Sequence, residues 1–286
     1  MKLIILLFAS LFLSCAAPKQ AVAPRATIAK GVEVVTMDYT VTKDGQTMPT
    51  KIYLLDVQLS ERITLVATAV GDSDSSIQPT HQVATAVAPI SAQLNAMQAN
   101  RPDVEVLGGV NADFFHIRSS QMVCGVVYRG GKALKSECDD LTTVFAVLKD
   151  GSARCMTNEE YRQCDKSTIA EAVSGRQMLL NDGVAQSSDT RLEPRTAVGV
   201  TEDGKRVFIL VGDGRRKEYS NGLSYADMAV IFKQLGAYDA INLDGGGSSS
   251  FCLKSSKGLF APANRPSDRS GERSVPNGLA VIRVKK

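Results

Sequence analysis

Short runs of alternating hydrophobic and polar residues fill most of the chain and predict β-strands. Several pairs of these runs flank Asp-Gly or Gly-Gly, a strong short-range sign of a β-hairpin. The predicted hairpins cover 32–59, 125–134, 143–154 and 196–212. Further strands are predicted at 63–70, 104–115, 176–184, 238–243 and 274–284. Strands joined mostly by hairpins, with few helices between them, predict an α+β fold with largely antiparallel sheets.

Apolar residues at helical spacing predict only a few helices. The clearest covers 223–236, where Ser224 is the N-cap, Asp227 follows three positions on, and Gly236 ends the helix. The other helical segments are predicted at 82–97 and, as a shorter piece, at 158–174.

The first fifteen residues have a short positive start followed by an apolar run. That run is too short to span a membrane and is typical of a secretion signal. Cys15 resembles the cysteine of a bacterial lipoprotein cleavage site, which becomes the lipidated first residue; ordinary cleavage near Ala16-Ala17 is the alternative. Residues 16–30, with two prolines and no periodicity, predict a linker. We expect an exported protein, in the periplasm or as an outer-membrane or cell-surface lipoprotein held by the lipid alone.

Composition argues against several classes of function. The formal net charge is only +3 and the Lys and Arg residues are scattered, so no nucleic-acid-binding surface is expected. Trp is absent and aromatic residues make up 6% of the chain, which disfavours a stacking platform for long glycans. With only His81 and His116 present, a phosphodiesterase that uses a histidine pair is disfavoured.

Five cysteines follow the predicted signal. In an exported protein Cys124 and Cys138, or Cys155 and Cys164, are near enough in sequence to form disulfides, which would leave Cys252 as a free thiol. The spacings do not suggest a zinc site.

The strongest functional feature is the polar stretch after the predicted strand at 238–243. Asn242 and Asp244 end that strand, and the residues after them are Gly245, Gly246, Gly247, Ser248 and Ser249. Successive glycines allow backbone N–H groups to converge on an anion, and a carboxylate beside them suits a sugar, a phosphate or a metal. A plain Gly/Ser connection between two strands is the alternative.

Six motifs in a fixed order carry a resemblance to a known family. They are Asn111-Ala-Asp-Phe-Phe115, Pro194-Arg-Thr-Ala-Val-Gly199, Asp213-Gly-Arg215, the helix at 223–236, Asn242-Leu-Asp-Gly-Gly-Gly-Ser-Ser249 and Val275-Pro-Asn-Gly-Leu279. In this order, over about residues 107–283, the chain resembles the phosphodiester glycosidase family, which includes the mannose 6-phosphate uncovering enzyme and bacterial relatives. Relatives often carry glycine in place of Ala112-Asp113, so Asp113 matches the family less well than Asn111.

The resemblance implies a hydrolase that removes a sugar, N-acetylglucosamine in the animal enzyme, from a sugar-1-phosphodiester and leaves a phosphomonoester. It divides the chain into a β-rich region with one helix at 31–106 and a catalytic domain at 107–286.

The residue chemistry is consistent with that reaction. Arginine forks bind phosphate oxygens, and glycosidases commonly use carboxylates. The candidate catalytic residues, in order, are Asp244, Asp213 and Asp113. The candidate substrate-binding residues are Asn111, Arg195, Thr196, Arg215, Asn242, Gly245, Gly246, Gly247, Ser248, Ser249, Arg273 and Asn277. Turn-forming roles for the aspartates, and structural loop bonds for the asparagines, are the alternatives.

Two rival functions stay open. One is a metal-assisted phosphodiesterase in which Asp113, Asp213 and Asp244 surround Ca²⁺ or Mg²⁺. The other is a non-catalytic envelope lipoprotein that binds glycans or phosphopolymers. For the hydrolase itself the sequence identifies no required cofactor, and a divalent cation, Ca²⁺ or Mg²⁺, is the alternative. Loss of activity with a chelator would favour the metal-assisted enzyme.

Overall fold

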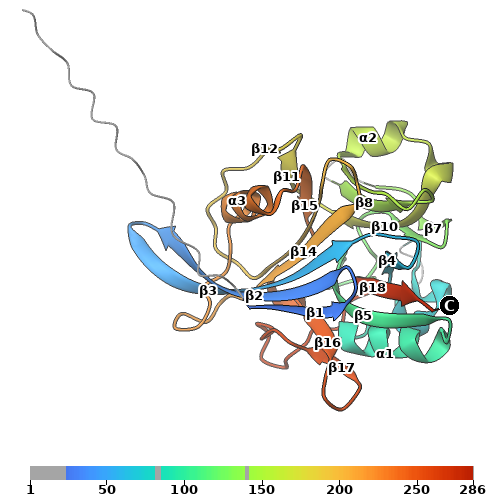
Figure 1. Ribbon diagram of the computed structural model, residues 1–286, viewed down its shortest axis with the longest axis horizontal. Coiled ribbons are helices and arrows are strands. Elements are labelled where there is room, and N and C mark those ends of the chain that lie inside the picture. The colour runs from blue at the N-terminus through green and yellow to red at the C-terminus, as the bar shows by residue number, and fades with distance from the viewer. Residues whose placement is uncertain (1–23, 81–84, 139–141, 286) are drawn as a thin grey trace, which may run out of the picture.

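The computed structural model describes residues 24–80, 85–138 and 142–285. The predicted signal peptide with Cys15, most of the predicted linker, and His81 lie outside these described residues. Within them, eighteen strands form three sheets, and three α-helices pack on the sheets (Figure 1). The predicted α+β fold with mostly antiparallel sheets is therefore confirmed.

The largest sheet has eight strands and carries one helix. Its strands, in order across the sheet, are β1 (Arg25–Ala29), β2 (Val32–Lys43), β3 (Gln46–Gln58), β14 (Arg206–Gly212), β13 (Arg195–Val200), β15 (Asp239–Asn242), β11 (Met178–Asn181) and β12 (Val184–Ala185). Helix α3 (Tyr225–Leu235) packs Met228 and Phe232 against Phe208 of β14. Ser224 forms the predicted capping box with Asp227, so the chain enters α3 in a fixed direction.

The second sheet contains a strand where a helix was predicted. Its strands, in order, are β7 (Lys132–Lys135), β6 (Val127–Arg129), β10 (Ile169–Gly175), β8 (Thr143–Leu148) and β9 (Ala153–Met156). The helical prediction at 158–174 was wrong beyond α2 (Asn158–Gln163) and the short turn η3 (Lys166–Thr168), because β10 follows them. β10 is a central strand buried on both faces, so it lacks the alternation that would have marked it as a strand.

The third sheet lies beside helix α1 (Ile90–Asn100). Its strands, in order, are β17 (Phe260–Pro262), β16 (Phe251–Lys254), β5 (Val104–Asn111), β18 (Gly278–Val284) and β4 (Ile63–Ala67). Residues 82–84 of the helix predicted at 82–97 lie outside the described residues. Within the described part the helix begins only after Pro89, because Ala88 pairs with Val275 as an isolated β-bridge. The strand predicted at 63–70 stops at Ala67, and the turns η1 (Val70–Asp72) and η2 (Asp74–Ser76) follow it.

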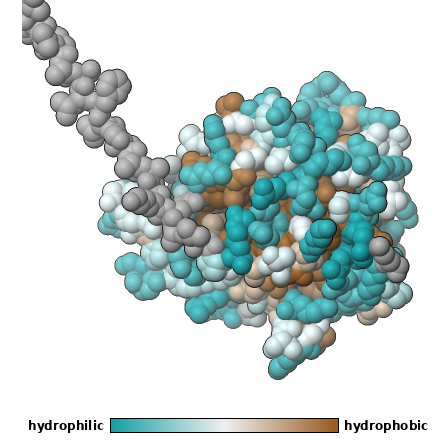
Figure 2. Space-filling view, in the orientation of Figure 1, coloured by the Kyte–Doolittle hydropathy of each residue, from teal (hydrophilic) through white to brown (hydrophobic). Residues whose placement is uncertain are grey.

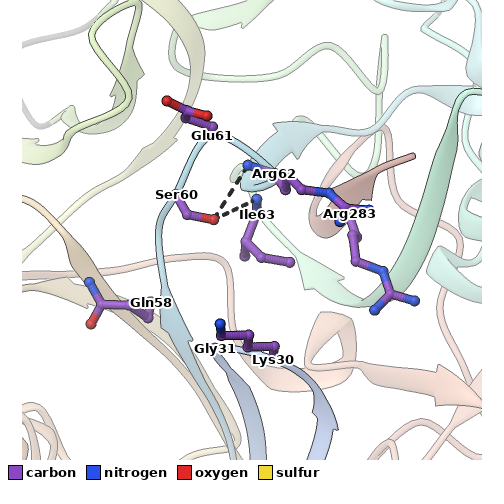
Figure 3. A pocket seen from close by; sticks show the side chains of 8 residues that line it. All are labelled: Lys30, Gly31, Gln58, Ser60, Glu61, Arg62, Ile63 and Arg283. Atoms are coloured by element: carbon purple, nitrogen blue, oxygen red, sulfur yellow. Dashed lines mark hydrogen bonds between the residues drawn. The ribbon is translucent and has the colours of Figure 1, made fainter. Parts of the chain in front are cut away.

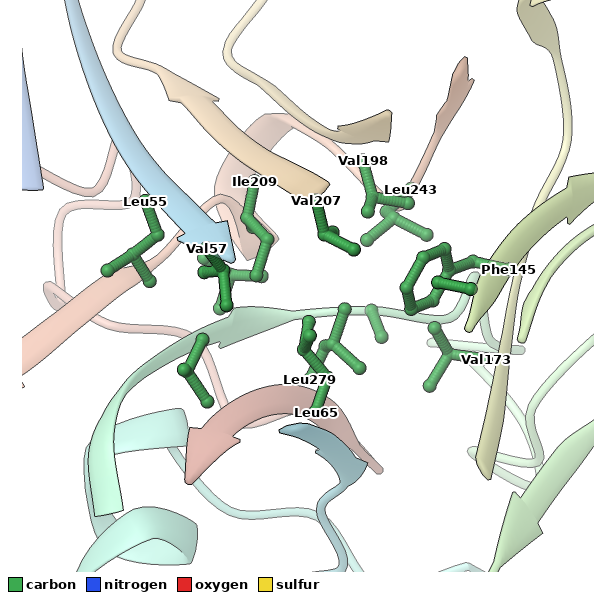
Figure 4. Packing of buried hydrophobic residues seen from close by; sticks show 14 of the residues in the cluster. Leu55, Val57, Leu65, Phe145, Val173, Val198, Val207, Ile209, Leu243 and Leu279 are labelled. Carbon is green, nitrogen blue, oxygen red and sulfur yellow. The ribbon is translucent and has the colours of Figure 1, made fainter. Parts of the chain in front are cut away.

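All three sheets contribute to one central core (Figure 4). Val57 and Ile209 come from the eight-stranded sheet, Phe145 from the second sheet, and Leu65 and Leu279 from the third. Burying a side chain of this size stabilises the fold by roughly 1.5–3 kcal/mol relative to leaving it exposed. The strands of the N-terminal region therefore share a core with the strands of the predicted catalytic domain.

Strand pairing also joins the N-terminal region to the rest of the chain. β3 pairs with β14 over its last seven residues, and β4 pairs with β18. β1 begins at Arg25 and pairs with β2, so ordered sheet structure starts inside the range predicted as linker.

Polar side chains cover much of the face shown in Figure 2, with apolar side chains between them. Among the described residues, no helix is long and apolar enough to cross a membrane.

The five described cysteines are all free thiols. Cys155 is buried in the central core, where its Sγ lies 3.8 Å from the Val198 carbonyl oxygen. Cys164 instead packs on the cluster under α2, together with Cys138. The predicted pairing of Cys155 with Cys164 is therefore not formed, and neither is that of Cys124 with Cys138.

Candidate active site

The glycine-rich segment lies where the ends of several strands meet. Asn111 at the end of β5 pairs with Gly278 at the start of β18. Arg195 at the start of β13 pairs with Gly212 at the end of β14. β15 ends at Asn242 beside β13, and the chain then enters the short turn η4 (Gly246–Ser248). The strand topology thus brings five of the predicted motifs to one end of the sheets, and the helix at 223–236 reaches that end with its N-terminus, where Leu223 pairs with Glu193.

Gly245 and Gly246 are required by close packing on the neighbouring strand. A Cβ on Gly245 would lie 2.8 Å from the carbonyl oxygen of Pro194. Gly246 has φ +62°, and its N–H donates to the same carbonyl oxygen at 2.8 Å. The N–H of Gly245 donates to Asp244 Oδ1 at 2.9 Å. Because both N–H groups already donate to protein oxygens, the predicted backbone nest for an anion does not form from these two residues.

Two arginines lie against the turn formed by Gly245, Gly246 and Gly247 (the glycine turn). A Cβ on Gly246 would lie 3.1 Å from Arg215 Nη2, and a Cβ on Gly247 would lie 2.1 Å from Arg273 Nη2. The Arg215 side chain is 49% exposed, and its Nε donates to Glu193 Oε2 at 2.8 Å. The positive charge at this turn is therefore carried by side chains.

Arg273 connects the turn to two further groups. Its Nε and Nη2 donate to the two carboxylate oxygens of Asp268 at 2.8 and 3.1 Å, and its Nη1 donates to Ser248 Oγ at 3.2 Å. The Ser248 side chain also interacts with the carboxyl of Asp244 and lowers its pKa. A single hydroxyl thus joins the carboxyl of Asp244 to a guanidinium.

Asp244 is the predicted catalytic residue that keeps contact with solvent, since it is only partly buried. Burial raises the pKa of its carboxyl to about 6. The bonds from Ser248 and from the Gly245 N–H, and the charges of Arg273 and Arg176, act against that rise in pKa. At neutral pH the carboxyl is therefore mostly ionised and close to its titration range.

Asp113 is enclosed by protein and is only 2% exposed. Its carboxylate accepts from Asn277 Nδ2 at 2.7 Å and from the Ser174 N–H at 3.1 Å, while its own N–H donates to Asn277 Oδ1 at 3.3 Å. Burial raises the pKa of Asp113 to about 7 in spite of these donors. Asp113 and Asn277 therefore hold the ends of β5, β10 and β18 together.

Asp213, which is 1% exposed, is enclosed in the same way. Its carboxylate accepts from Asn264 Nδ2 at 2.8 Å, the Arg265 N–H at 2.9 Å and the Tyr219 hydroxyl at 3.1 Å. Burial raises the pKa of Asp213, and these three donors oppose the rise. Its contacts fix the start of the segment 264–273, which carries Asp268 and Arg273.

The predicted polar residues Asn111 and Thr196 bind the loop itself. Asn111 Nδ2 donates to the Asp244 carbonyl oxygen at 2.6 Å, and its Oδ1 accepts from Thr196 Oγ1 at 2.8 Å and from the Ser250 N–H at 3.1 Å. Asn111 therefore holds both ends of the glycine-serine segment.

Asn242 and Arg195 are likewise committed to protein groups. Asn242 Oδ1 accepts from the Gln177 N–H at 2.6 Å, and its Nδ2 donates to Leu243 and to the Tyr225 hydroxyl. Arg195 stacks on the Tyr225 ring at 4.2 Å and donates through Nε to the Leu223 carbonyl oxygen at 3.1 Å. Both residues anchor α3 to the site.

Three residues near the site were not predicted from the sequence. Asp268 lies in a polar loop without a recognisable motif. Ser174 lies near the end of β10, which was predicted as a helix, and Arg176 follows that strand. Arg176 stacks on Phe114 at 5.4 Å and influences the pKa of Asp244. Correct assignment of β10 would have brought Ser174 and Arg176 to the same end of the sheets as Asp113.

The hydroxyls of Ser249 and Ser250 are buried and have no hydrogen-bond partner among the described residues. Ser249 was predicted to bind substrate, and its carbonyl oxygen accepts from Asn264 Nδ2 at 3.1 Å. Its backbone therefore has a structural role, whereas its hydroxyl is uncommitted within the described protein.

The three predicted aspartates do not form a metal-binding set. Each carboxylate accepts hydrogen bonds from protein donors of its own, and no group of three His, Cys, Asp or Glu side chains within the described ranges is arranged to hold a metal ion. The donor set therefore does not fit the Ca²⁺ or Mg²⁺ site that the sequence suggested as an alternative, and we derive no chemical step through a metal.

A separate groove of about 490 Å³ lies at the opposite ends of the strands (Figure 3). Lys30, Arg62 and Arg283 line it, and Gln58 borders it at the end of β3. Ile52, six residues earlier in β3, pairs with Gly212 near the glycine-rich segment. The groove contains none of the predicted site residues.

Comparison with known proteins agrees with this arrangement. The family model for phosphodiester glycosidases matches residues 105–282. Bovine N-acetylglucosamine-1-phosphodiester alpha-N-acetylglucosaminidase is 26% identical over 163 residues, which cover 50% of this chain and only 30% of the bovine protein.

Two solved structures share the fold. One is the catalytic domain of zebrafish N-acetylglucosamine-1-phosphodiester alpha-N-acetylglucosaminidase, auto-inhibited by its pro-peptide; it has a TM-score of 0.62 and 17% identity over 94% of this chain and 88% of its own. The other is a hypothetical protein from Synechocystis, with a TM-score of 0.57 and 14% identity over 93% of this chain and 64% of its own. At these identities the similarity shows the fold alone.

The family match covers more than half of the chain. It also contains all the predicted site residues, from Asn111 to Asn277. On this evidence the chain belongs to the phosphodiester glycosidase family.

Proposed function

We propose that the chain hydrolyses glycosyl phosphodiesters, releasing a free sugar and leaving a phosphomonoester. The observation that carries the proposal is the connection from Asp244 through the Ser248 hydroxyl to Arg273. In a glycosyl phosphodiester, the anomeric carbon and the anionic phosphate are joined through one oxygen. A carboxyl and a guanidinium separated by one hydroxyl match these two parts of the substrate.

The phosphate would be bound by Arg273 and Arg215, which lie against Gly247 and Gly246 of the glycine turn. Planar guanidinium forks suit phosphate oxygens because two parallel N–H groups can meet two oxygens. The same charges stabilise the phosphomonoester as it leaves, and this reduces the need for a proton donor at the leaving oxygen.

Asp244 would act at the anomeric carbon, either as the nucleophile or as the base that activates water. Its ionised form is the reactive one in both cases, and a pKa of about 6 leaves it mostly ionised at neutral pH. Asp113 and Asp213 have protein donors on their carboxylates and would hold the surrounding loops. This assignment keeps the first predicted catalytic residue and gives the other two a positioning role.

N-acetylglucosamine is the sugar to test first. The bovine and zebrafish relatives carry the name N-acetylglucosamine-1-phosphodiester alpha-N-acetylglucosaminidase. The sugar and its aglycone in this protein are part of the proposal.

Hydrolysis of UDP-N-acetylglucosamine and other sugar-1-phosphodiesters in oxygen-18 water tests the reaction. Native protein is compared with Asp244→Asn, and with Asp239→Asn as a matched control at the other end of β15. We expect the label in the free sugar, loss of turnover by at least about 10³-fold in Asp244→Asn, and little change in Asp239→Asn.

Three outcomes would contradict the proposal. Label in the phosphate would indicate cleavage at phosphorus. Loss of turnover with a chelator would favour the metal-assisted phosphodiesterase. Binding of these sugars without turnover, by a folded protein, would favour the envelope binding protein.

We also propose that the protein is exported and lipidated at Cys15. β1 begins at Arg25, so nine residues separate Cys15 from the first strand of the described structure. Fully extended, such a segment reaches about 30 Å. The fold would then stay close to the membrane surface.

A further inference from the structure

We propose that the carboxylate of Asp268 occupies the phosphate-binding edge of Arg273 and is displaced when the substrate binds. The inference rests on the proposed function, because it assigns a role to a residue in the same site. Asp268 would act as a positioning and specificity residue that holds Arg273 in place between turnovers.

The first support is the geometry of the pair. Asp268 accepts from Nε and Nη2 of Arg273 with its two oxygens, at 2.8 and 3.1 Å. This side-on arrangement of two parallel bonds is the one in which a guanidinium recognises a carboxylate or a phosphate. A phosphate that uses the same edge must therefore replace Asp268.

The second support is the location of the pair on the glycine turn. A Cβ on Gly247 would lie 2.1 Å from both Asp268 Oδ1 and Arg273 Nη2. The carboxylate oxygen thus lies directly against the turn, one hydroxyl contact away from Asp244 through Ser248. This is the position required of the phosphate in the proposed reaction.

The third support is that the exchange preserves charge and is not opposed by deep burial. The side chains of Asp268 and Arg273 are 28% and 26% exposed. A phosphodiester carries one negative charge, as the carboxylate does, so Arg273 keeps one anionic partner before and after the exchange. A neutral glycoside offers Arg273 no such replacement, and Asp268 therefore favours substrates with an anionic aglycone.

The segment that carries Asp268 is anchored outside this side chain. Asn264 is buried and bound to Asp213, and Glu272 accepts from the N–H and hydroxyl of Ser91 at 3.0 and 2.6 Å. Rotation of the Asp268 side chain therefore leaves both anchors in place. Glu272, the other carboxylate beside Arg273, is committed to α1 and also lies 3.3 Å from Cys252.

Calorimetric titration of the full chain with inorganic phosphate tests this exchange without any turnover. Asp268→Asn keeps the shape of the side chain and removes its charge. Because a partly exposed ion pair contributes little, we expect phosphate to bind about two- to fivefold more tightly to Asp268→Asn than to native protein. Glu202→Gln, an exposed change of the same charge in the β13–β14 turn, is the control and should bind phosphate as native protein does.

A second measurement needs no change at Asp268. In native protein the Nε–Hε NMR signal of Arg273, assigned by its loss in Arg273→Lys, should shift as phosphate is added.

With a sugar phosphodiester, Asp268→Asn should lower KM about two- to fivefold and leave kcat unchanged, because it removes a cost shared by the ground and transition states.

Equal or weaker phosphate binding by a folded Asp268→Asn would overturn the inference, as would an Arg273 signal that does not respond to phosphate. A fall in kcat would assign Asp268 to the chemical step instead. If phosphate competes with Asp268 but no diester is cleaved, the proposed function fails while the exchange at Arg273 stands.

Discussion

Removal of the Ser248 hydroxyl is expected to move the acid limb of the pH–rate profile to higher pH. In native protein, kcat/KM should fall below about pH 6, because protonation of Asp244 removes the reactive form. The Ser248 hydroxyl and the charge of Arg273 both lower the pKa of Asp244 against the effect of burial. Ser248→Ala removes the hydroxyl. It also removes the acceptor of the hydrogen bond from Arg273 Nη1 and so weakens the positioning of that charge.

The size of the shift follows from the strength of that hydrogen bond. A hydrogen bond to a charged group contributes about 1.5–3 kcal/mol, and 1.36 kcal/mol corresponds to one pKa unit. The limb should therefore move upward by about one unit or more, from about 6 to about 7 or above. At pH 6 this alone lowers the ionised fraction of Asp244 from about one half to about one tenth or less.

The assay is kcat/KM for a sugar phosphodiester between pH 4.5 and about 8.5, with constant ionic strength. Ser250→Ala is the matched control, because Ser250 lies in the same segment and its buried hydroxyl has no partner among the described residues. Its limb should coincide with that of native protein. A limb that stays in place in Ser248→Ala, or that moves equally in both variants, would refute the role given to the hydroxyl.

Further predictions concern the turn, the buried carboxyl, the helix cap and the N-terminus. Gly247→Ala should raise KM for an anionic substrate about tenfold with little loss of thermal stability, because the new Cβ displaces the mobile end of Arg273; an unchanged KM would contradict this. Asp113 has a pKa raised from 3.8 to about 7 on folding, so its contribution to stability is full below pH 3.8 and is lost as the pH rises through about 7. The loss amounts to roughly 4 kcal/mol, and urea unfolding should show a flatter dependence on pH for Asp113→Asn than for native protein. Ser224→Ala should lower the free energy of unfolding by about 1 kcal/mol through loss of the N-cap of α3, and an equal urea midpoint would argue against it. Cys15→Ala should abolish labelling with radioactive palmitate in a bacterial host, whereas continued labelling would place the lipid elsewhere.

The features predicted correctly from the sequence are those with local causes. The Asp-Gly turn between β13 and β14 and the capping box of α3 are fixed by residues within a few positions of one another. β10 was missed because its hydrogen bonds come from β6 and β8, which are distant in sequence, and because burial on both faces removes its alternation. α1 begins late because residues before Pro89 pair with the chain near Val275, a contact that helical periodicity does not reveal.

The candidate site shows the same difference between features with local causes and features that depend on contacts between distant residues. Asp244 and the glycines could be proposed as site residues from the sequence because they lie in one stretch at a strand end. Asp268 and Arg176 come from separate loops, and only the assembled sheets bring them to that stretch. The structure also changes the role of the glycines, whose main effect is to let Arg215 and Arg273 approach the turn.

The buried amides explain why asparagine and aspartate are not interchangeable around this turn. Asn111 Nδ2 donates to the Asp244 carbonyl oxygen, so a carboxylate at position 111 would set two acceptors against each other at 2.6 Å. Asn277 meets the same requirement by donating to Asp113. A buried amide that is bonded at both ends holds its neighbours in one arrangement, because losing either bond leaves an unsatisfied group. The loop is therefore held by neutral amides, and the carboxyl of Asp244, with a pKa of about 6, is mostly ionised at neutral pH.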